Sequence, residues 1–276
     1  MNGLKFVTAG QPICNGNAGY ENAFKILEDL KLDGMELEFV HGVRMTEANQ
    51  RLVKEIANEK NMVLTAHGPY YINLNSKEED KIEASIKRVL DTARMGYKLG
   101  AYSITYHAAF YMGMTPEDVY KKVESSMVEI SKTLDEENLD IWVRPETTGK
   151  PTQWGNLEEI VKLSKDFKNV LPCVDFAHLH ARTNGKFNTY DEFCYAFELI
   201  GKELGTTALE NFHAHIAGIE YGEKGEKKHL LLEESDMNYK DLLKAFKKFD
   251  VKGVIVCESP IMEKDAVLLK EYYLSL

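Results

Sequence analysis

The sequence predicts an α/β protein built as a single eight-stranded parallel barrel, the (β/α)8 or TIM barrel architecture. A short β-rich run, a polar turn and a longer segment of helical periodicity recur about every 25 to 40 residues. The strand candidates are mostly continuous apolar runs, as expected for a parallel sheet that is covered on both faces. The 276 residues contain no Gly/Ser-rich linker, low-complexity tract or long like-charge block, so we interpret residues 1–276 as one domain.

Eight segments have the composition of buried strands. They cover residues 4–9, 34–39, 62–66, 102–106, 139–143, 170–174, 209–215 and 254–257. Segments of helical periodicity follow them at residues 21–32, 47–59, 78–99, 116–137, 157–167, 190–204, 239–249 and 263–274. Pro116 suits the first turn of a helix, and Thr115 and Asn156 suit N-caps. Eight successive strand and helix pairs favour a closed barrel over an open sheet.

The connection formed by residues 220–236 differs from the others in length and composition. It is polar, contains glycine and is longer than the other connections between a strand and a helix. The active sites of such barrels lie on the face formed by the carboxyl ends of the strands. We therefore predict that residues 220–236 form a functional loop on that face.

The composition also limits the class of protein. A content of 44% hydrophobic and 28% charged residues is that of an ordinary soluble protein. No apolar run approaches the ~20 residues that cross a bilayer, and the start MNGLKFVTAG is too short and too polar for a signal peptide. We expect a cytoplasmic protein that does not enter a membrane. The four cysteines lack CxxC spacing, which predicts reduced thiols rather than disulfides or a thiolate zinc site.

The formal net charge of -10 argues against a protein that coats phosphate backbones indiscriminately, because such affinity comes from clustered Lys and Arg. It does not exclude a nucleic-acid substrate. Several carboxylates are candidate metal ligands, and two or three divalent ions would return about +4 to +6 to the site.

Histidines and carboxylates stand at the ends of six successive predicted strands. They are His67, His107, Glu146, Asp175, His178, His215 and Glu258. All of them fall on one rim of the barrel. Neutral imidazole and carboxylate suit zinc or manganese, and bridging carboxylates allow two or more ions to lie close together. Such paired ions can activate water and stabilise both oxygens of a phosphoryl displacement, so the pattern predicts a multinuclear metal site.

Single members of this set have simpler interpretations. A lone histidine at a strand end is usually a hydrogen-bonded structural residue, and Glu146 is equally compatible with an ion pair to Arg144 or Lys150. We nevertheless favour metal binding, because six successive strands each bring a ligand-type residue to the same rim. We expect His41 to be a surface or loop residue, and a structural or supporting role for His180 and His213.

The sequence has no GxSxG elbow, no P-loop and no GxGxxG placed after a strand. It therefore gives no support to an enzyme that uses a covalent nucleophile or binds a nucleotide through these motifs.

At these residues the chain resembles the endonuclease IV family of apurinic/apyrimidinic endonucleases (AP endonuclease family 2), within the xylose-isomerase-like barrels. HisGlyProTyrTyrIleAsnLeuAsn, residues 67–75, looks like the family's histidine and Ile-Asn-Leu signature. Weaker matches are ProGluThrThrGly from residue 145, AspPheAlaHis from residue 175 and GluSerPro from residue 258. The similarity extends from the third predicted strand to the eighth.

The resemblance implies a cluster of two or three zinc ions, with manganese as an alternative metal. His67, His107 and Glu146 would hold one ion, and Glu146 would bridge to a second ion held also by Asp175, His215 and Glu258. His178 and His229 would hold a third. Glu146 and Glu258 would also tune the attacking water and thereby act as catalytic residues. The implied substrate is DNA with abasic or damaged sites, cleaved 5′ of the lesion by a protein that we expect to be a monomer.

Tyr70 and Asn73 would bind this substrate, because both belong to the signature segment next to His67. A tyrosine pair at a metal rim, here Tyr70 and Tyr71, often serves loop packing alone. It is also able to stack on a base or sugar.

Two segments depart from the family pattern. The family's third ion is held by an Asp-x-His element, but here Lys227 stands where the aspartate is expected and His229 follows. We expect a weakly held third ion, because a lysine cation cannot ligate and repels the metal, unless Glu226 substitutes through a shifted loop. The second predicted strand, MetGluLeuGluPheValHis, resembles sugar-isomerase-like barrels more than the DNA-contacting loop of the family.

This second departure leaves an alternative function open, a sugar or sugar-phosphate isomerase or epimerase. It would use Glu146, Asp175, His215 and Glu258 around one divalent ion, with two carboxylates moving protons at carbon. The additional histidines His67, His107 and His178 favour the nuclease, since a mononuclear isomerase has no evident need for them. A barrel that only binds DNA or a partner would have little reason to assemble such a ligand set.

Overall fold

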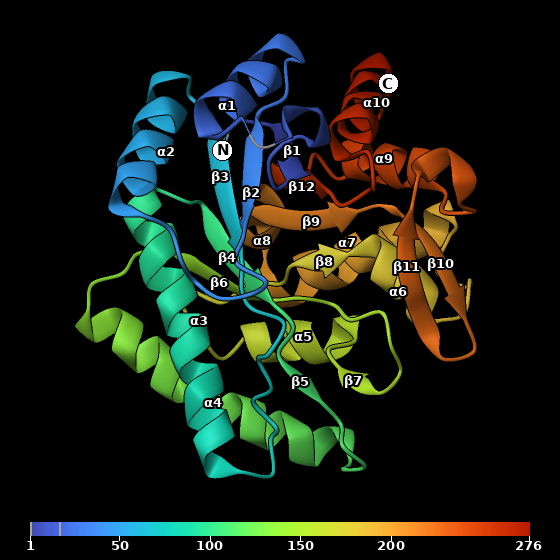
Figure 1. The fold of residues 1–276 in the computed structure, drawn as a ribbon. Coiled ribbons are helices and arrows are strands. Elements are labelled where there is room, and N and C mark those ends of the chain that lie inside the picture. Colours follow the sequence, from blue (N-terminus) through green and yellow to red (C-terminus); the bar gives the residue numbers. More distant parts are fainter. Residues whose placement is uncertain (1, 17) are drawn as a thin grey trace.

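The computed structural model describes residues 2–16 and 18–276, and the strands of its main sheet all run parallel (Figure 1). The strands are β1 (Leu4–Ala9), β2 (Gly34–Glu38), β3 (Val63–His67), β4 (Ser103–Tyr106), β6 (Trp142–Pro145), β8 (Val174–Asp175), β9 (Phe212–Ile216) and β12 (Gly253–Cys257). Their order in the sheet is β6-β4-β3-β2-β1-β12-β9-β8. The two edges meet through parallel bridges from Val143 to Val170 and from Glu146 to Cys173, so the predicted barrel is confirmed.

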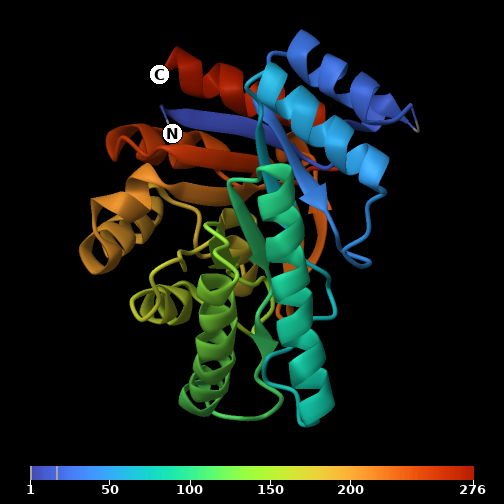
Figure 2. The same ribbon diagram turned by 90° about the vertical axis from the view of Figure 1, so that its left-hand side faces the viewer.

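Helices surround this barrel. They are α1 (Tyr20–Asp29), α2 (Glu47–Glu59), α3 (Glu79–Leu99), α4 (Pro116–Glu136), α5 (Leu157–Ser164), α6 (Phe176–Arg182), α7 (Tyr190–Leu204), α8 (Thr206–Glu210), α9 (Tyr239–Lys248) and α10 (Met262–Ser275), with short 3-10 turns η1 (Ile13–Asn15) and η2 (Leu232–Glu234). The expected caps are present: the Thr115 hydroxyl accepts from Asp118 N, and Asn156 forms a capping box with Glu159. The long helices α3 and α4 lie side by side and extend past the end of the barrel (Figure 2).

Three strands differ from the prediction by more than one residue at a boundary. The fifth strand begins at Trp142 rather than residue 139, because Leu139 N donates to Leu134 O and thereby closes the end of α4. The sixth strand is reduced to β8 at Val174–Asp175. Residues 206–210, partly assigned to the seventh strand, form α8, where Leu209 packs against Gly201 of α7.

Residues 220–236 are a folded extension rather than an irregular loop. Strands β10 (Gly218–Gly222) and β11 (Gly225–Leu230) form an antiparallel hairpin that packs against α6, and η2 follows it (Figure 1). A second small pair joins β5 (Ala109–Phe110) to β7 (Gln153–Trp154). The predicted loop therefore has a defined shape, which fixes the direction of its side chains.

Strand alternation separates an apolar wall from a polar interior. In β2, Met35 and Leu37 belong to the core between the barrel and its helices, whereas Glu36 is buried against Thr65 and His215. Side chains of alternate residues point to opposite faces of a strand, so the same pattern places polar groups inside the barrel. Across residues 2–16 and 18–276, no helix is both long and apolar enough to span a membrane.

Candidate metal centre

All eight predicted ligands lie at the carboxyl ends of the strands or on the hairpin beside them. His67 ends β3, His107 and Glu146 follow β4 and β6, and Asp175 ends β8. His178 lies on the first turn of α6, since the Asp175 side chain caps that helix by accepting from His178 N. His215 is on β9, His229 on β11 and Glu258 directly after β12. Parallel strands thus deliver these groups to one rim, as the sequence pattern predicts.

The ligand-type atoms of these eight predicted residues form three overlapping groups. The groups are His67, His107 and Glu146; then Glu146, Asp175, His215 and Glu258; then Asp175, His178 and His229. Within each group the nitrogen and oxygen atoms all lie within 4.8 Å of one another. Glu146 is common to the first two groups and Asp175 to the last two. This sharing is the arrangement that bridging carboxylates require.

Glu146 is at the centre of the arrangement and is buried. Its Oε1 lies 3.1 Å from His107 Nε2, 3.2 Å from His178 Nδ1 and 3.5 Å from His215 Nδ1. Its Oε2 lies 3.1 Å from His67 Nε2. One carboxylate therefore contacts four imidazoles from four different parts of the chain.

The ion pair of Glu146 with Arg144 considered above does not form. Arg144 is buried below the rim and donates to the carbonyl oxygens of Pro172 and Asn211. Its guanidinium carbon lies over the rings of Tyr102 and Trp142, at 5.4 and 5.6 Å from their centres. The contacts of Glu146 are thus with the histidines of the rim.

Three of the histidines direct Nδ1 at a backbone carbonyl oxygen. The pairs are His67 with Gly68 at 2.7 Å, His178 with Thr147 at 2.9 Å and His229 with Glu258 at 3.2 Å. A carbonyl oxygen only accepts, so Nδ1 carries the hydrogen and the neutral ring has its lone pair on Nε2. Each Nε2 then faces a carboxylate oxygen, as His67 Nε2 faces Glu146 Oε2. Two acceptors in such a position need a proton or a metal ion between them, and this tautomer is typical of metal-bound histidine.

Several atoms of the groups are buried and have no hydrogen-bond partner in the described part of the chain. They are His107 Nε2, Asp175 Oδ2, both ring nitrogens of His215 and His229 Nε2. An unpaired buried polar atom costs about 1–3 kcal/mol, so an accumulation of five in these groups needs a common explanation. Imidazole and carboxylate are the donor types that zinc and manganese accept, and the residues therefore fit divalent metal ions.

The electrostatics of the rim also favour cations. Burial alone would lower the pKa of His67, but the hydrogen bond and charge of Glu146, with the charges of Glu38 and Glu36, raise it to about 10. Burial works against the ionised form of Glu258, yet the nearby His215 and His229 lower its pKa to about 2. Burial and the charges of Glu258 and Glu146 raise the pKa of Asp175 well above its ordinary value. Crowded carboxylates thus hold protons at the site, and metal ions would compete for the same positions.

Residues 24–272 match the family described as xylose isomerase-like TIM barrel. The chain belongs to this family. An uncharacterized protein of Methanocaldococcus jannaschii is 43% identical, over 98% of this chain and 97% of that protein. A probable endonuclease 4 of Nitrosopumilus maritimus is 28% identical over 58% of this chain and 63% of its own length.

Solved structures of two different activities share the fold. Endonuclease IV from Thermus thermophilus superimposes with a TM-score of 0.74 at 15% identity, over 99% of both chains. A D-tagatose 3-epimerase-like protein superimposes with a TM-score of 0.72 at 17% identity, over 93% of this chain and 94% of that chain. The fold is therefore shared by a nuclease and an epimerase-like protein, and the side chains of this xylose isomerase-like barrel must decide between the two activities.

Glu36 is a site residue that the strand pattern did not single out. It lies fully buried inside the barrel, where Oε2 accepts from Thr65 Oγ1 at 2.7 Å and lies 3.2 Å from His213 Nε2. Its Oε1 lies 3.1 Å from His215 Nε2. The signal was available in the sequence, because a glutamate that alternates with Met35 and Leu37 in a barrel strand must point into the interior.

A pocket of about 220 Å³ opens at the ends of β1 and β2, beside this carboxylate. Its lining includes Gly10, Gln11, Tyr20, Glu36 and Glu38. The pocket is polar and adjoins the strand-two residues that differ from the endonuclease pattern.

The two predicted substrate-binding residues are placed differently from each other. Tyr70 is 60% exposed at the mouth, with its ring 6.0 Å from that of His67 and 6.3 Å from that of His41. Asn73 is engaged within the loops, since its Oδ1 accepts from Asn75 N at 3.1 Å and Phe110 N at 3.3 Å. Tyr70 is therefore free to meet a ligand, whereas Asn73 holds the loop that carries Tyr70.

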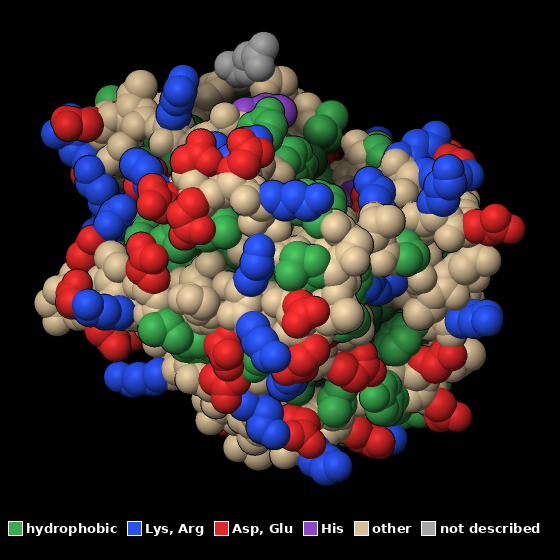
Figure 3. Space-filling model, turned by 90° about the horizontal axis from the view of Figure 1, so that it is seen from below, with side chains coloured by type: hydrophobic (Ala, Val, Ile, Leu, Met, Phe, Trp, Pro, Cys, Tyr) green, Lys and Arg blue, Asp and Glu red, His purple; other side chains and the backbone are tan. Residues whose placement is uncertain are grey.

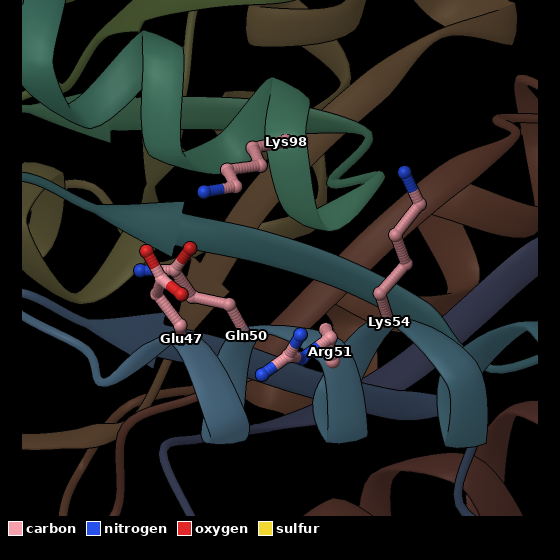
Figure 4. A pocket seen from close by; sticks show the side chains of 5 residues that line it. All are labelled: Glu47, Gln50, Arg51, Lys54 and Lys98. Carbon is pink, nitrogen blue, oxygen red and sulfur yellow. The ribbon is translucent and has the colours of Figure 1, made fainter.

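Another surface groove lies away from the rim, between α2 and α3. It has a volume of about 370 Å³ and is lined by Glu47, Gln50, Arg51, Lys54 and Lys98. Lys98 faces it from α3 and the other side chains from α2 (Figure 4). Gln50 is used in holding the chain, because its Nε2 donates to Met45 O at 2.7 Å. The groove belongs to the outer wall of the barrel and takes no part in the metal centre.

Proposed function

We propose that this barrel is a zinc-dependent endonuclease that hydrolyses the DNA phosphodiester bond at abasic sites. The observation that carries the proposal is the overlap of the three ligand groups through Glu146 and Asp175. An isomerase with one ion needs only the group of four residues that contains both shared carboxylates, Glu146 and Asp175. The further histidines His67, His107 and His178 have a purpose when two or three ions are bound.

The ligand groups divide the ions among them. His67, His107 and Glu146 would hold one ion, and Glu146, Asp175, His215 and Glu258 the second. A third would lie at His178 and His229. Bound divalent ions supply an activated water at neutral pH and neutralise charge on the phosphate that is attacked.

The protein's own contribution is to orient these groups and to keep them rigid. Glu146 is held between four imidazoles, and the backbone carbonyls fix the rings of His67, His178 and His229. Glu258 has an exposed side-chain fraction of 14%, against 1% for Glu146 and Asp175, so it is the most accessible carboxylate of the second ligand group. We assign Glu146 and Glu258 the catalytic role of tuning the attacking water.

The charge of the molecule is compatible with a DNA substrate that is bound at the rim. The face seen in Figure 3 carries Lys and Arg interspersed with Asp and Glu rather than a uniform basic stripe. Binding would thus depend on the ions and on exposed groups at the mouth such as Tyr70. A protein of this kind should bind the lesion site and show little affinity for DNA in general.

The deciding experiment uses a duplex with one abasic site. The protein as purified, without added magnesium, should nick this duplex, and prolonged chelation followed by zinc should remove and restore the activity. Metal analysis should give two or three zinc ions per chain. Interconversion of ketoses or their phosphates by protein that leaves the duplex intact would refute the proposal.

A sugar isomerase or epimerase is the second candidate. The pocket lined by Glu36 and Glu38 favours it, because a small polar pocket at the carboxyl ends of barrel strands suits a sugar with many hydroxyls. It predicts one exchangeable manganese or magnesium ion per chain instead of several zinc ions.

A further inference from the structure

The β10–β11 hairpin contains an extra residue that changes which side chains face the metal centre. Tyr221 pairs with Glu226 and Glu220 pairs with Lys228, so Lys227 is left without a partner in the ladder. Such a bulge interrupts the alternation of a strand. Lys227 and Lys228 both turn toward Glu220, with Nζ atoms 3.1 and 3.5 Å from its carboxylate oxygens. In a regular strand Lys227 would lie on the same face as His229. Because of the bulge, Glu226 lies on that face instead.

The carboxylate of Glu226 reaches the third ligand group. Its Oε2 lies 3.5 Å from His178 Nε2, the nitrogen that keeps the lone pair when Nδ1 donates to Thr147 O. The side chain of Glu226 is 20% exposed, and that of Lys227 is 58% exposed. The Glu226 carboxylate therefore lies at the third ligand group, whereas the Lys227 ammonium group lies in solvent.

Gly149 makes this approach possible. A Cβ atom at this position would lie 2.7 Å from both Glu226 Cβ and Glu226 Oε2, and 2.9 Å from His178 Cδ2. The backbone fixes the same contact, since Glu226 N donates to Gly149 O at 3.0 Å. Gly225 adopts φ +85° there, and its own Cβ would lie 2.2 Å from Gly149 O. Two glycines thus create the space in which Glu226 and His178 meet.

We propose that Glu226 completes the third metal site together with His178 and His229, in place of the aspartate that Lys227 replaces in the sequence. Two imidazoles and the Glu226 carboxylate, beside Asp175 that the third group shares with the second, suit zinc, and His229 Nε2 is buried without a partner in the described residues. This inference rests on the proposed metal role of the rim. It also changes the expectation from sequence: Lys227 neither ligates nor repels the ion, because its ammonium group pairs with Glu220 on the other side of the hairpin.

The proposal is tested by zinc binding to metal-free protein, without an activity measurement. Calorimetric titration and metal analysis are carried out on the wild type, Glu226→Gln and Lys227→Ala. The wild type should bind three zinc ions. Glu226→Gln should weaken one of these events by at least about tenfold and leave two unchanged, and Lys227→Ala should leave all three unchanged.

Two further variants keep the result interpretable. Gly149→Ala retains every ligand but fills the space that Glu226 uses, so it should weaken the same single event. Lys227→Asp should not tighten any event. Circular dichroism and thermal melting of each variant establish that the barrel is folded.

A wild type that binds fewer than three ions would overturn the proposal, as would Glu226→Gln binding three ions with wild-type affinity. Tighter binding by Lys227→Asp would show that position 227 does face the ion. Failure of the nuclease proposal would be distinguishable from failure of this one. Protein that binds three ions in the predicted way but does not nick abasic DNA would refute the proposed activity and leave Glu226 as a metal ligand.

Discussion

His215 Nε2 lies 3.1 Å from Glu36 Oε1 inside the barrel, while Nδ1 of the same ring lies 3.3 Å from Glu258 Oε1 at the rim. The side chains of His215 and Glu36 are both fully buried. The imidazole therefore stands between a carboxylate beneath the site and the ligand groups above it. A carboxylate in this position orients a metal-bound histidine and raises its basicity.

The first prediction follows from this contact. Glu36→Gln should reduce zinc affinity at the site of His215 by about 10–100-fold, because the amide keeps the volume but removes the charge behind the ring. Glu55→Gln, an exposed glutamate on α2 at the outer wall of the barrel, is the matched control and should retain wild-type affinity. Zinc titration of the three metal-free proteins measures the difference. Equal affinities for all three would mean that Glu36 serves the fold alone.

The second prediction concerns the shared carboxylate. Glu146→Gln should reduce nicking of abasic DNA by more than about a hundredfold, since an amide cannot bridge two ions with two anionic oxygens. The barrel should stay folded, because Glu146 lies at the rim and not among the apolar contacts of the core. Activity, zinc content and circular dichroism are measured on one preparation. A variant that keeps most of its activity and its metal would exclude the bridging role.

The sequence allowed the barrel and the rim to be predicted because the evidence was local. His67, His107 and Glu146 each come at or closely after the end of an apolar run, and parallel strands bring their carboxyl ends together, so these candidate ligands could be assigned to one rim without coordinates. Glu36 was overlooked because its alternation with Met35 and Leu37 resembles a strand with one solvated face. In a closed barrel the second face is also buried.

The position of Glu226 could not be read from the sequence. The bulge at Lys227 depends on how β10 and β11 pair, and on the fit of Gly149 against Gly225 from a distant part of the chain. Tertiary contacts of this kind have no local signature. The short strand β8 is a similar case, since the chain turns into α6 as soon as Asp175 caps the helix.

The third prediction is that zinc binding releases protons. The carboxylates raise the pKa of His67 to about 10 from an ordinary 6.5, against the effect of burial, and those of His178 and His215 also lie well above that value. In metal-free protein the protonated His67 stabilises the fold fully below pH 6.5, and this contribution is lost as the pH rises through about 10. Zinc must displace these protons, so its affinity should rise with pH in this window, by up to about tenfold per pH unit for each proton displaced.

Calorimetry at about pH 7.5 in two buffers of different ionisation enthalpy counts the protons released. His67→Gln should release fewer protons than the wild type. A zinc affinity that does not change across the window would show that the rim histidines are neutral before the metal binds.

The last prediction tests whether the exposed ring at the mouth contacts the substrate. Tyr70 has the position for it: the residue is 60% exposed, and its ring lies 6.0 Å from that of His67, a member of the first ligand group. An aromatic ring that stacks on a base contributes about 1–3 kcal/mol to nucleic-acid binding. Tyr70→Ala should therefore weaken binding of abasic duplex DNA by roughly 5- to 150-fold, given that 1.4 kcal/mol is about tenfold. Zinc content should not change, because Tyr70 supplies no ligand atom.

Tyr97→Ala is the control, since Tyr97 is also exposed, at 46%, but lies near the end of α3. Fluorescence anisotropy with labelled abasic and intact duplexes measures the affinities. If both variants bind the abasic duplex as tightly as the wild type does, then Tyr70 packs the loop and the DNA contact lies elsewhere on the rim.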